Sequence, residues 1–296
     1  MNYTVYYIVH LLTMFSIYAI LGVSLNLVVG YTGLVSVTQA AFYGIGAYAT
    51  ALIAKTAGFG FFSSMLIGAI VAGLIGLLIG LVLSKFRDDY YVIVTVGFNI
   101  IAYGIFMNWH SLTRGPLGIV AVPRPKIDLF GLHLDFNNNL LFLALVLVFL
   151  ALIYFLARFI AKSSFGRVLK AIREDEKAIQ VFGYNAFYFK LAIFVISAGM
   201  AAVAGSFFAS YLRFTSPNTF VLMESILILS MIILGGLANL KGSLLGAFIL
   251  VLLPELMRFV GFPNEIAAEM RQIVYGVILV LLMIFRPSGI MGEYKL

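Results

Sequence analysis

Only a few side chains in this sequence could do chemistry, and most of them stand alone within long apolar runs. A polar group among apolar residues is costly unless it finds a partner or performs a function. We therefore expect these groups either to line a path for a polar solute or to form hydrogen bonds between helices, and for Glu224 we favour the path. The side chains concerned are Asn26, Gln39, Asn99, Asn108 and Glu224.

The same inventory argues against catalysis in this chain. There is no cysteine, which excludes thiolate metal sites and cysteine nucleophiles. His10, His110 and His133 lie at the predicted ends of apolar runs or in a loop, where they form no acid-base pair within a span. Glu255 follows Pro254, and we interpret it as a structural group paired with a nearby arginine. We expect no catalytic residue, no metal site and no cofactor.

Composition identifies the medium in which these residues lie. Of the 296 residues, 63% are hydrophobic and 10% are charged, and the mean hydropathy is +1.09. A soluble domain could not hide so much apolar surface from water, so most of the chain must face lipid or other helices. We expect one all-α transmembrane domain over residues 1–296.

The apolar runs predict a polytopic bundle of about eight to nine membrane-embedded helices. A hydrocarbon core of about 30 Å takes roughly 20 helical residues for each crossing. The runs are separated by short breaks of Gly, Pro, Asn or charged residues. They are Val5–Val29, Leu34–Ala54, Phe61–Leu83, Tyr90–Trp109, Leu140–Phe159, Leu191–Leu212, Val221–Leu240, Leu244–Val260 and Ile273–Phe285.

Two junctions between runs are unusually short. Gly30–Gly33 and Ala238–Gly242 leave almost no loop between consecutive hydrophobic segments. Each junction is either a turn between two full spans or the break of a broken or re-entrant helix, and the sequence leaves both alternatives open.

Lys and Arg divide unevenly between the two sides of the membrane. If residues 162–188 face the cytoplasm, 12 of these residues fall inside and 7 outside, in agreement with the positive-inside rule. This predicts a cytoplasmic C-terminus and, with nine crossings, an external N-terminus. No Lys or Arg precedes the first run, which we interpret as a retained span. The net charge of +7 is spread over loops and indicates no nucleic-acid partner.

Two polar segments interrupt the membrane pattern. Residues 110–139 contain three prolines and predict an external loop that could form a docking surface. Residues 162–188 predict two short amphipathic cytoplasmic helices. Asp175 is the expected N-cap of the second helix and Gly183 its expected end. Such a segment either fits a groove on a partner or lies on the membrane surface, and the pattern alone does not decide.

Five stretches, in order along nearly the whole chain, resemble the permeases of branched-chain amino acid ATP-binding-cassette importers, of the type that pairs with a second permease. The segment Gly166–Asn185 resembles the coupling segment of that family. Gly33–Tyr48 resembles its early glycine-rich signature, and Tyr90–Asn99 resembles a further characteristic sequence of the family. Ser225–Glu255 and Arg286–Gly292 are similar to the late signature and the C-terminal ending. The chain departs from the family pattern at Ser36–Gln39 and at Thr113–Gly115.

The resemblance implies a permease without catalysis of its own in the inner membrane of a bacterial cell. Its implied partners are a second permease, two cytoplasmic ATPases, an external solute-binding protein, membrane lipid and an amino-acid substrate. The chain lacks the nucleotide-binding pattern G-x-x-x-x-G-K-[S/T], so ATP would be hydrolysed by the partners. The residues that would couple to an ATPase are Gly166, Arg167, Lys170, Arg173, Glu174, Asp175 and Gly183.

Two alternatives remain from the residues alone. A stand-alone secondary transporter or channel for a small polar solute would need a titratable relay within the membrane, and Glu224 and Glu255 are few and close to predicted ends. An intramembrane enzyme would need paired acidic or histidine side chains in mid-span, which makes it the weakest of the three hypotheses.

Overall fold

The computed structural model describes residues 3–84, 86, 88–129 and 132–259, together with scattered residues between 273 and 294. Helices dominate the described residues, with four very short strands. The helices are α1 (Tyr3–Thr32), α2 (Gln39–Thr56), α3 (Phe61–Leu83), α4 (Asp88–Asn108), α5 (His110–Thr113), α6 (Asn139–Lys162), α7 (Ser164–Glu174), α8 (Glu176–Val181), α9 (Ala186–Leu212), α10 (Leu222–Gly235) and α11 (Leu240–Phe259), with the 3-10 turns η1 (Gly115–Leu117) and η2 (Pro217–Thr219).

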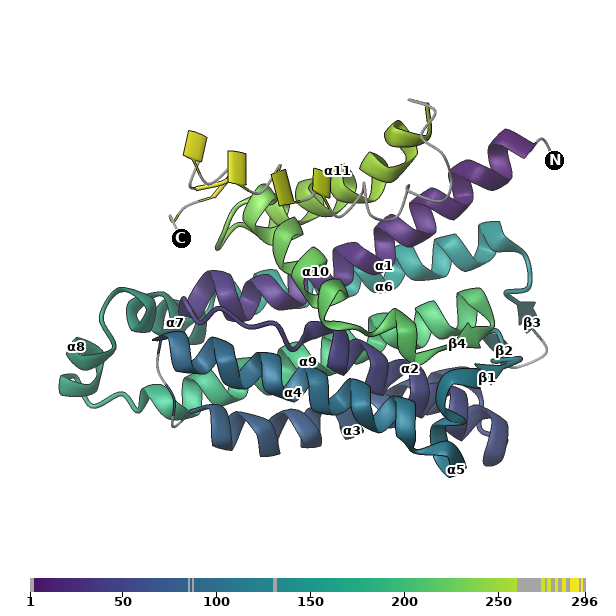
Figure 1. The fold of residues 1–296 in the computed structure, drawn as a ribbon, viewed down its shortest axis with the longest axis horizontal. Helices are drawn as coiled ribbons and strands as arrows, with labels where there is room; N and C mark the ends of the chain where they lie inside the picture. The colour runs from purple at the N-terminus through teal and green to yellow at the C-terminus, as the bar shows by residue number, and fades with distance from the viewer. Residues whose placement is uncertain are drawn as a thin grey trace.

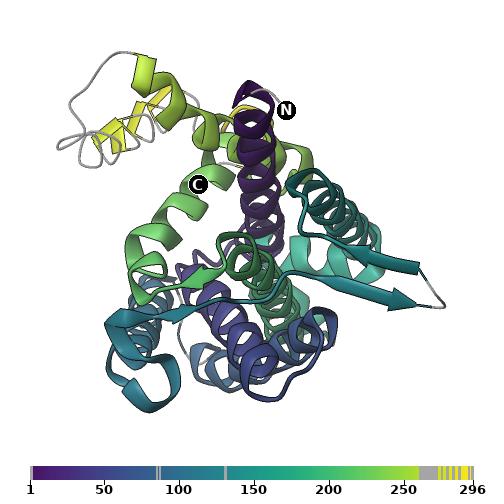
Figure 2. The same cartoon turned by 90° about the vertical axis from the view of Figure 1, so that its right-hand side faces the viewer.

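The long helices run side by side, and the remaining elements gather at the two ends of the bundle (Figure 1). At one end α7 and α8 stand out beyond the long helices. At the other end lie α5, the N-terminal end of α1 and the strands (Figure 2). Strand β1 (Ile119–Val120) pairs with β4 (Phe214–Thr215), and β2 (Lys126–Leu129) forms an antiparallel hairpin with β3 (Leu132–Asp135).

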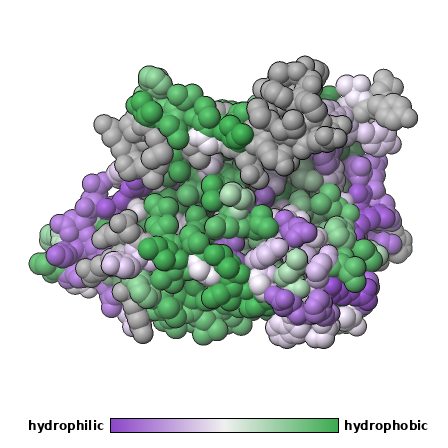
Figure 3. Space-filling model, in the orientation of Figure 1, coloured by the Kyte–Doolittle hydropathy of each residue, from purple (hydrophilic) through white to green (hydrophobic). Residues whose placement is uncertain are grey.

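The molecular surface has the polarity of a membrane protein. Figure 3 shows a broad hydrophobic band across the middle of the bundle, with hydrophilic residues towards both ends. Within the described part of the chain, 6 helical stretches are long and apolar enough to cross a membrane. They are Thr4–Thr32, Phe61–Leu83, Tyr90–Asn108, Asn139–Lys162, Ala186–Leu212 and Pro217–Gly235.

The predicted count of eight to nine membrane-embedded helices is therefore not confirmed. The second apolar run became α2, which is short and largely buried inside the bundle. The eighth became α11, which has Pro254 in its interior and is outside the set of candidate spans. The ninth, Ile273–Phe285, is described only in separate pieces, which do not establish a span.

Both short junctions are non-helical, although each is shifted from its predicted bounds, and we call them the first and the second break. The second is a tight turn, because α11 packs back against α10: a Cβ on Gly246 would collide with the Met231 carbonyl. At the first break, Gly33–Thr38, α1 has ended, Gly33 has a φ of 76°, and the chain runs without regular structure to α2. At the second break, Gly236–Asn239, two residues have positive φ, with Gly236 at 120°. The helix α2 has 18 residues and rises about 27 Å, slightly less than the hydrocarbon thickness of about 30 Å. The helix α10 has 14 residues, and only together with the preceding turn η2 does it form the 19-residue candidate span Pro217–Gly235.

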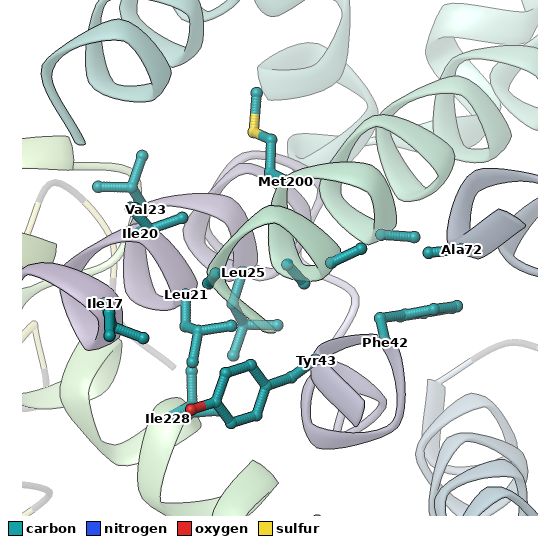
Figure 4. Close-up of a cluster of buried hydrophobic side chains, with 14 of the residues drawn as sticks. Ile17, Ile20, Leu21, Val23, Leu25, Phe42, Tyr43, Ala72, Met200 and Ile228 are labelled. Carbon is teal, nitrogen blue, oxygen red and sulfur yellow. The ribbon is translucent and has the colours of Figure 1, made fainter. Parts of the chain in front are cut away.

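The core forms around α9, which packs against α1, α2 and α3. Large apolar side chains of α1 and α2 converge there with residues of the neighbouring helices (Figure 4). Close packing depends on small residues: a Cβ on Gly46 would collide with the backbone of Ala202, and one on Gly205 with the backbone of Tyr43. These two glycines therefore allow α2 and α9 to pack closely against each other.

This close approach gives a matched pair of substitutions. Gly46→Ala should lower the free energy of unfolding by about 1–3 kcal/mol, because the added methyl meets backbone that cannot rotate away. Gly97→Ala on α4 should be neutral or stabilising, since nothing lies within 4 Å of a Cβ there and alanine favours helix. Unfolding midpoints measured in detergent compare the two. Equal midpoints would refute the proposed packing of α2 on α9.

Candidate functional site

Asn26 on α1 satisfies the backbone of the second break. Its Nδ2 donates to the carbonyl oxygens of Gly236 at 3.3 Å and Asn239 at 3.0 Å and to Ser243 Oγ at 2.6 Å, while its Oδ1 accepts from the Ala238 N–H at 3.0 Å. Irregular backbone in a membrane must find such partners inside the protein. Asn26 was a candidate for lining a solute path. Its hydrogen bonds are those expected from the alternative, in which it joins two segments of the protein.

Two side chains of α4 do the same for the first break. Thr95 Oγ1 accepts from the Val37 N–H at 3.4 Å, and Asn99 Nδ2 donates to the Val37 carbonyl at 3.1 Å and to Ser225 Oγ at 2.8 Å. Ser225 Oγ also accepts from the Ala40 N–H at 2.8 Å, in the first turn of α2. Sequence reasoning missed Thr95 and Ser225, because a single hydroxyl in an apolar run gives little signal.

Gln39 begins α2 and ties it to α1. Its Nε2 donates to Ser24 Oγ at 2.5 Å and to the Leu21 carbonyl at 3.4 Å. Like Asn26, it makes hydrogen bonds between helices. Asn108 donates to the Gly104 carbonyl at 2.8 Å within its own helix and is solvent- or lipid-exposed.

Glu224 lies in the first turn of α10 and is held by α1. Tyr18 donates its hydroxyl to Glu224 Oε1 at 2.5 Å. Tyr43 of α2 is close enough to both groups to interact electrostatically, and its buried hydroxyl has no partner among the described residues. Figure 4 shows the Tyr43 hydroxyl directed towards Ile228 of α10. Buried Asn99 Oδ1 and Tyr48 OH also lack partners within the described chain.

Tyr18, Tyr43 and Glu224 form one polar cluster between α1, α2 and α10, and Asn99 of α4 joins it through Ser225, the residue next to Glu224. The cluster comprises Tyr18, Tyr43, Asn99 and Glu224. It combines one carboxylate with hydroxyl groups and an amide oxygen, which can bind an ammonium group or a water chain by hydrogen bonds. Of the five candidate path residues, the structure brings Asn99 and Glu224 to this place, whereas Asn26, Gln39 and Asn108 serve other contacts.

At the α7 end, the two predicted amphipathic helices are confirmed. Asp175 Oδ1 accepts from the N–H groups of Lys177 at 2.9 Å and Ala178 at 3.1 Å, as an N-cap should. Gly183 follows α8 with a φ of 85°, a conformation that suits the end of a helix. Gly166 is needed because a Cβ there would collide with the carbonyls at the end of α6.

Arg173 points into the molecule, towards α1. Its guanidinium donates to the Gly30 carbonyl and, at 3.5 Å, to that of Val29, so it caps the end of α1. It also lies 4.4 Å from the ring centroid of Tyr294, and burial lowers its pKa. Lys170 lies 5.4 Å from the ring of Tyr31. Both cations were predicted to contact an ATPase, and within this chain they make these contacts with α1 and the C-terminal segment.

Several other residues that were predicted to couple to an ATPase have exposed side chains or backbone. Glu174, Asp175 and Gly183 are exposed, and exposed Arg167 donates to Ser164 Oγ at 2.9 Å. The apolar stripe expected on α8 is not buried: Phe182 is 77% exposed and its neighbour Val181 is 87% exposed. We call these two residues the α8 tip.

The C-terminal segment closes the α7 end. The N–H groups of Ile290 and Met291 donate to the carbonyls of Leu234 at 2.9 Å and Gly235 at 3.0 Å, at the end of α10. Asn239 Nδ2 donates to the Met291 carbonyl at 2.8 Å. The second break, the end of α10 and the segment that carries Tyr294 are therefore bound together beside α7.

The opposite end has its own polar network. Arg124 donates to the Asn137 carbonyl at 2.6 Å, and Arg213 donates to Asn137 Oδ1 at 2.7 Å. Glu255 accepts a hydrogen bond from Tyr7, so Arg213 is not its hydrogen-bonding partner. The side chain of Arg258, the other arginine near Glu255, lies outside the described atoms. No group of three or more His, Asp or Glu side chains in the described residues could hold a metal ion.

Comparison with known proteins agrees with this architecture. Residues 7–283 match the family described as the permease component of the branched-chain amino acid transport system. The high-affinity branched-chain amino acid transport system permease protein LivM of Escherichia coli (strain K12) is 35% identical over 302 residues, which cover 96% of this chain and 69% of that protein.

Two more distant relatives are similar over most of their length. The permease protein LivH of the same E. coli strain is 27% identical over 95% of this chain and 93% of its own. The probable LivM of Methanocaldococcus jannaschii is 24% identical over 96% of this chain and 92% of its own. No solved structure gives a significant match.

The role of Asn26 can be measured directly. Asn26→Ala should lower the free energy of unfolding by about 1–3 kcal/mol, because it leaves buried carbonyl and N–H groups of the second break without partners. Limited proteolysis at Gly236–Asn239 should also become faster. Asn108→Ala is the control, since that amide only supports its own exposed helix turn. A variant at Asn26 as stable and as resistant as the Asn108 control would show that the break does not depend on this amide.

Proposed function

The chain belongs to the family of permease components of branched-chain amino acid transport systems, and from this premise we propose how it works within an ATP-driven importer. Its relatives are permease subunits, which favours this function over a stand-alone transporter or channel. We propose that residues 1–296 form one permease domain in the inner membrane of a bacterial cell, and that a second permease completes the path for branched-chain or related amino acids.

The α8 tip is the observation that carries the coupling proposal. Two large apolar side chains are almost fully exposed on a short helix that stands beyond the bundle, with Glu174, Asp175 and Lys177 close by in the chain (Figure 1). Apolar side chains surrounded by charges are typical of a surface that inserts into a groove of a partner. We assign this surface to a separate cytoplasmic ATPase.

Arg173 would carry the movement of α8 into the membrane. A short, capped helix such as α7 moves as a rigid lever, and its last turn is bound to the end of α1 through the Gly30 carbonyl. The first break lies directly beyond that end, and a Cβ on Gly33 would lie 3.1 Å from Arg173 Cγ. A shift of α7 therefore acts on α1 and on the first break together, and the irregular backbone gives α2 freedom to tilt.

The polar cluster is our proposed part of the solute path. Tyr18, Glu224 and Asn99 lie on helices that meet at the two breaks, so relative movement of these helices would open or close the space between them. A branched-chain amino acid carries an ammonium group that suits the carboxylate of Glu224, and an apolar side chain that suits the surrounding aromatic rings.

The orientation follows from the same assignment. With α8 against an ATPase, the C-terminal segment beside α7 is cytoplasmic, and the strands with residues 110–139 face outwards. We propose that the external solute-binding protein docks on that end.

Two substitutions separate docking from transmission of force. Phe182→Asp should abolish co-purification of the ATPase and uptake of amino acid, because a charge replaces the apolar anchor. Arg173→Ala should leave co-purification intact but lower uptake at least tenfold, and Arg173→Lys should restore part of it by keeping a donor for Gly30. The measurements are pull-down and uptake of labelled leucine by the reconstituted complex.

Leu117→Asp is the matched control for the docking variant, since Leu117 is 81% exposed at the opposite end of the bundle. It should retain the ATPase. Retention of the ATPase by Phe182→Asp would refute the α8 tip as the docking site, and full uptake by Arg173→Ala would refute the lever.

The absence of cysteine makes the orientation testable by labelling. Lys177→Cys on α8 should react with a membrane-impermeant maleimide only in inverted vesicles, whereas Leu117→Cys should react in intact cells. Each variant is the control for the other. The opposite labelling pattern would overturn the assignment of sides.

A further inference from the structure

An apolar groove runs along the outer face of α3, α6 and α9. It has a volume of about 510 Å³, and its lining side chains are all apolar. Exposed Leu74 of α3 and Leu152 of α6 form its rims, at 59% and 57% exposure. Gly73 and Gly199 are among its lining residues, and a Cβ on either would have no neighbour closer than 3.7 Å. A carbon atom placed at either glycine would make only ordinary van der Waals contacts, so the groove is not obstructed at these two positions.

The last turns of α6 extend this surface towards the α7 end. A second hollow, of about 390 Å³, is lined by Phe155, Arg158, Phe159, Lys162 and Ser163. Residues 152, 155, 159 and 162 follow one another at helical spacing, so the apolar groove and this hollow lie along one continuous strip of α6.

The strip ends in uncompensated positive charge. Arg158 and Lys162 are exposed, and Arg167 folds back to within 3.4 Å of the Lys162 carbonyl. Within the described chain no acidic side chain pairs with these three cations, whose nearest acidic segment, residues 174–176, uses Glu176 to bind Lys190 at 2.6 Å. Basic residues at the membrane boundary of a groove between helices attract anionic lipid headgroups.

The length of the strip matches one leaflet. From Phe149 to Lys162 the helix α6 rises about 20 Å, while half of the hydrocarbon core is about 15 Å thick. A lipid with its phosphate at Arg158 and Lys162 would therefore lay its acyl chain along Phe155 and Leu152 into the groove. We propose that this surface is a binding site for an anionic phospholipid, with the phosphate held by Arg158, Lys162 and Arg167.

A transmembrane helix of a second permease is the competing occupant. It would cover Arg158 and Lys162 with apolar surface, and burying two unpaired cations in that way is costly. A phosphate neutralises the cations and leaves them at the boundary, where long basic side chains can reach out of the hydrocarbon. Charge complementarity therefore favours lipid. The inference depends on neither the ATPase nor the direction of transport.

Native mass spectrometry of the purified chain tests the site. Wild-type protein should retain phosphatidylglycerol in preference to phosphatidylethanolamine of the same chain length. The double variant Arg158→Gln/Lys162→Gln should bind phosphatidylglycerol about 30-fold more weakly, because two cations near the surface are lost. The control Arg114→Gln/Lys126→Gln removes two cations at the opposite end and should bind as wild type.

A groove variant tests the acyl chain separately. Gly73→Leu should fill the groove and weaken retention of phosphatidylglycerol at least fivefold, while Gly97→Leu, which points into open space on α4, should not. The thermal unfolding midpoint of each variant establishes that it is folded. Equal retention of both lipids by wild type, unchanged lipid binding by the double variant, or unchanged lipid binding by Gly73→Leu would each overturn the proposal.

Discussion

The requirement that every peptide group in lipid find a hydrogen-bonding partner governs this structure. Helices end at two junctions, and the backbone N–H and carbonyl groups that these ends leave unpaired need partners inside the protein. Asn26 supplies the partners at the second break, and Thr95, Asn99 and Ser225 supply them at the first. Most of the polar residues in the apolar runs therefore act as hydrogen-bonding partners for the backbone of the breaks. In turn, these hydrogen bonds stabilise the non-helical backbone of the breaks.

The two breaks connect the parts of the molecule that transport must move together. The first lies between α1, which Arg173 binds to the cytoplasmic lever, and α2, which is embedded in the core against α9. The second joins α10 to α11 and is held by the C-terminal segment, whose Tyr294 also contacts Arg173. A permease that receives force from a partner needs rigid helices with a small number of joints, and here the joints lie next to the lever. The polar cluster around Glu224 lies where the helices from both joints meet.

Local interactions were well predicted from the sequence. Asp175 caps α8 and Gly183 ends it, because capping depends on a side chain and the backbone two or three residues away. Most long apolar runs became candidate spans, since hydropathy over about 20 residues is also a local property. The number of spans was predicted less well. Whether an apolar run of 18 residues crosses the membrane or lies buried within the bundle depends on its neighbours, as α2 illustrates.

The sequence by itself determined that this chain is a helical membrane protein, where its helices break, and to which family of permeases it belongs, because these properties are written in hydropathy, glycine positions and continuous motifs. Only the tertiary structure decided what each polar residue does. Asn26 and Asn99 look alike along the chain. The amide of Asn26 is fully hydrogen-bonded to the second break, whereas the Oδ1 of Asn99 has no partner among the described residues. Likewise Arg173 turned inwards and Phe182 outwards. Whether a side chain forms a hydrogen bond or stays exposed depends on segments that are often more than a hundred residues apart. The periodicity of one segment does not indicate which distant segment packs against it.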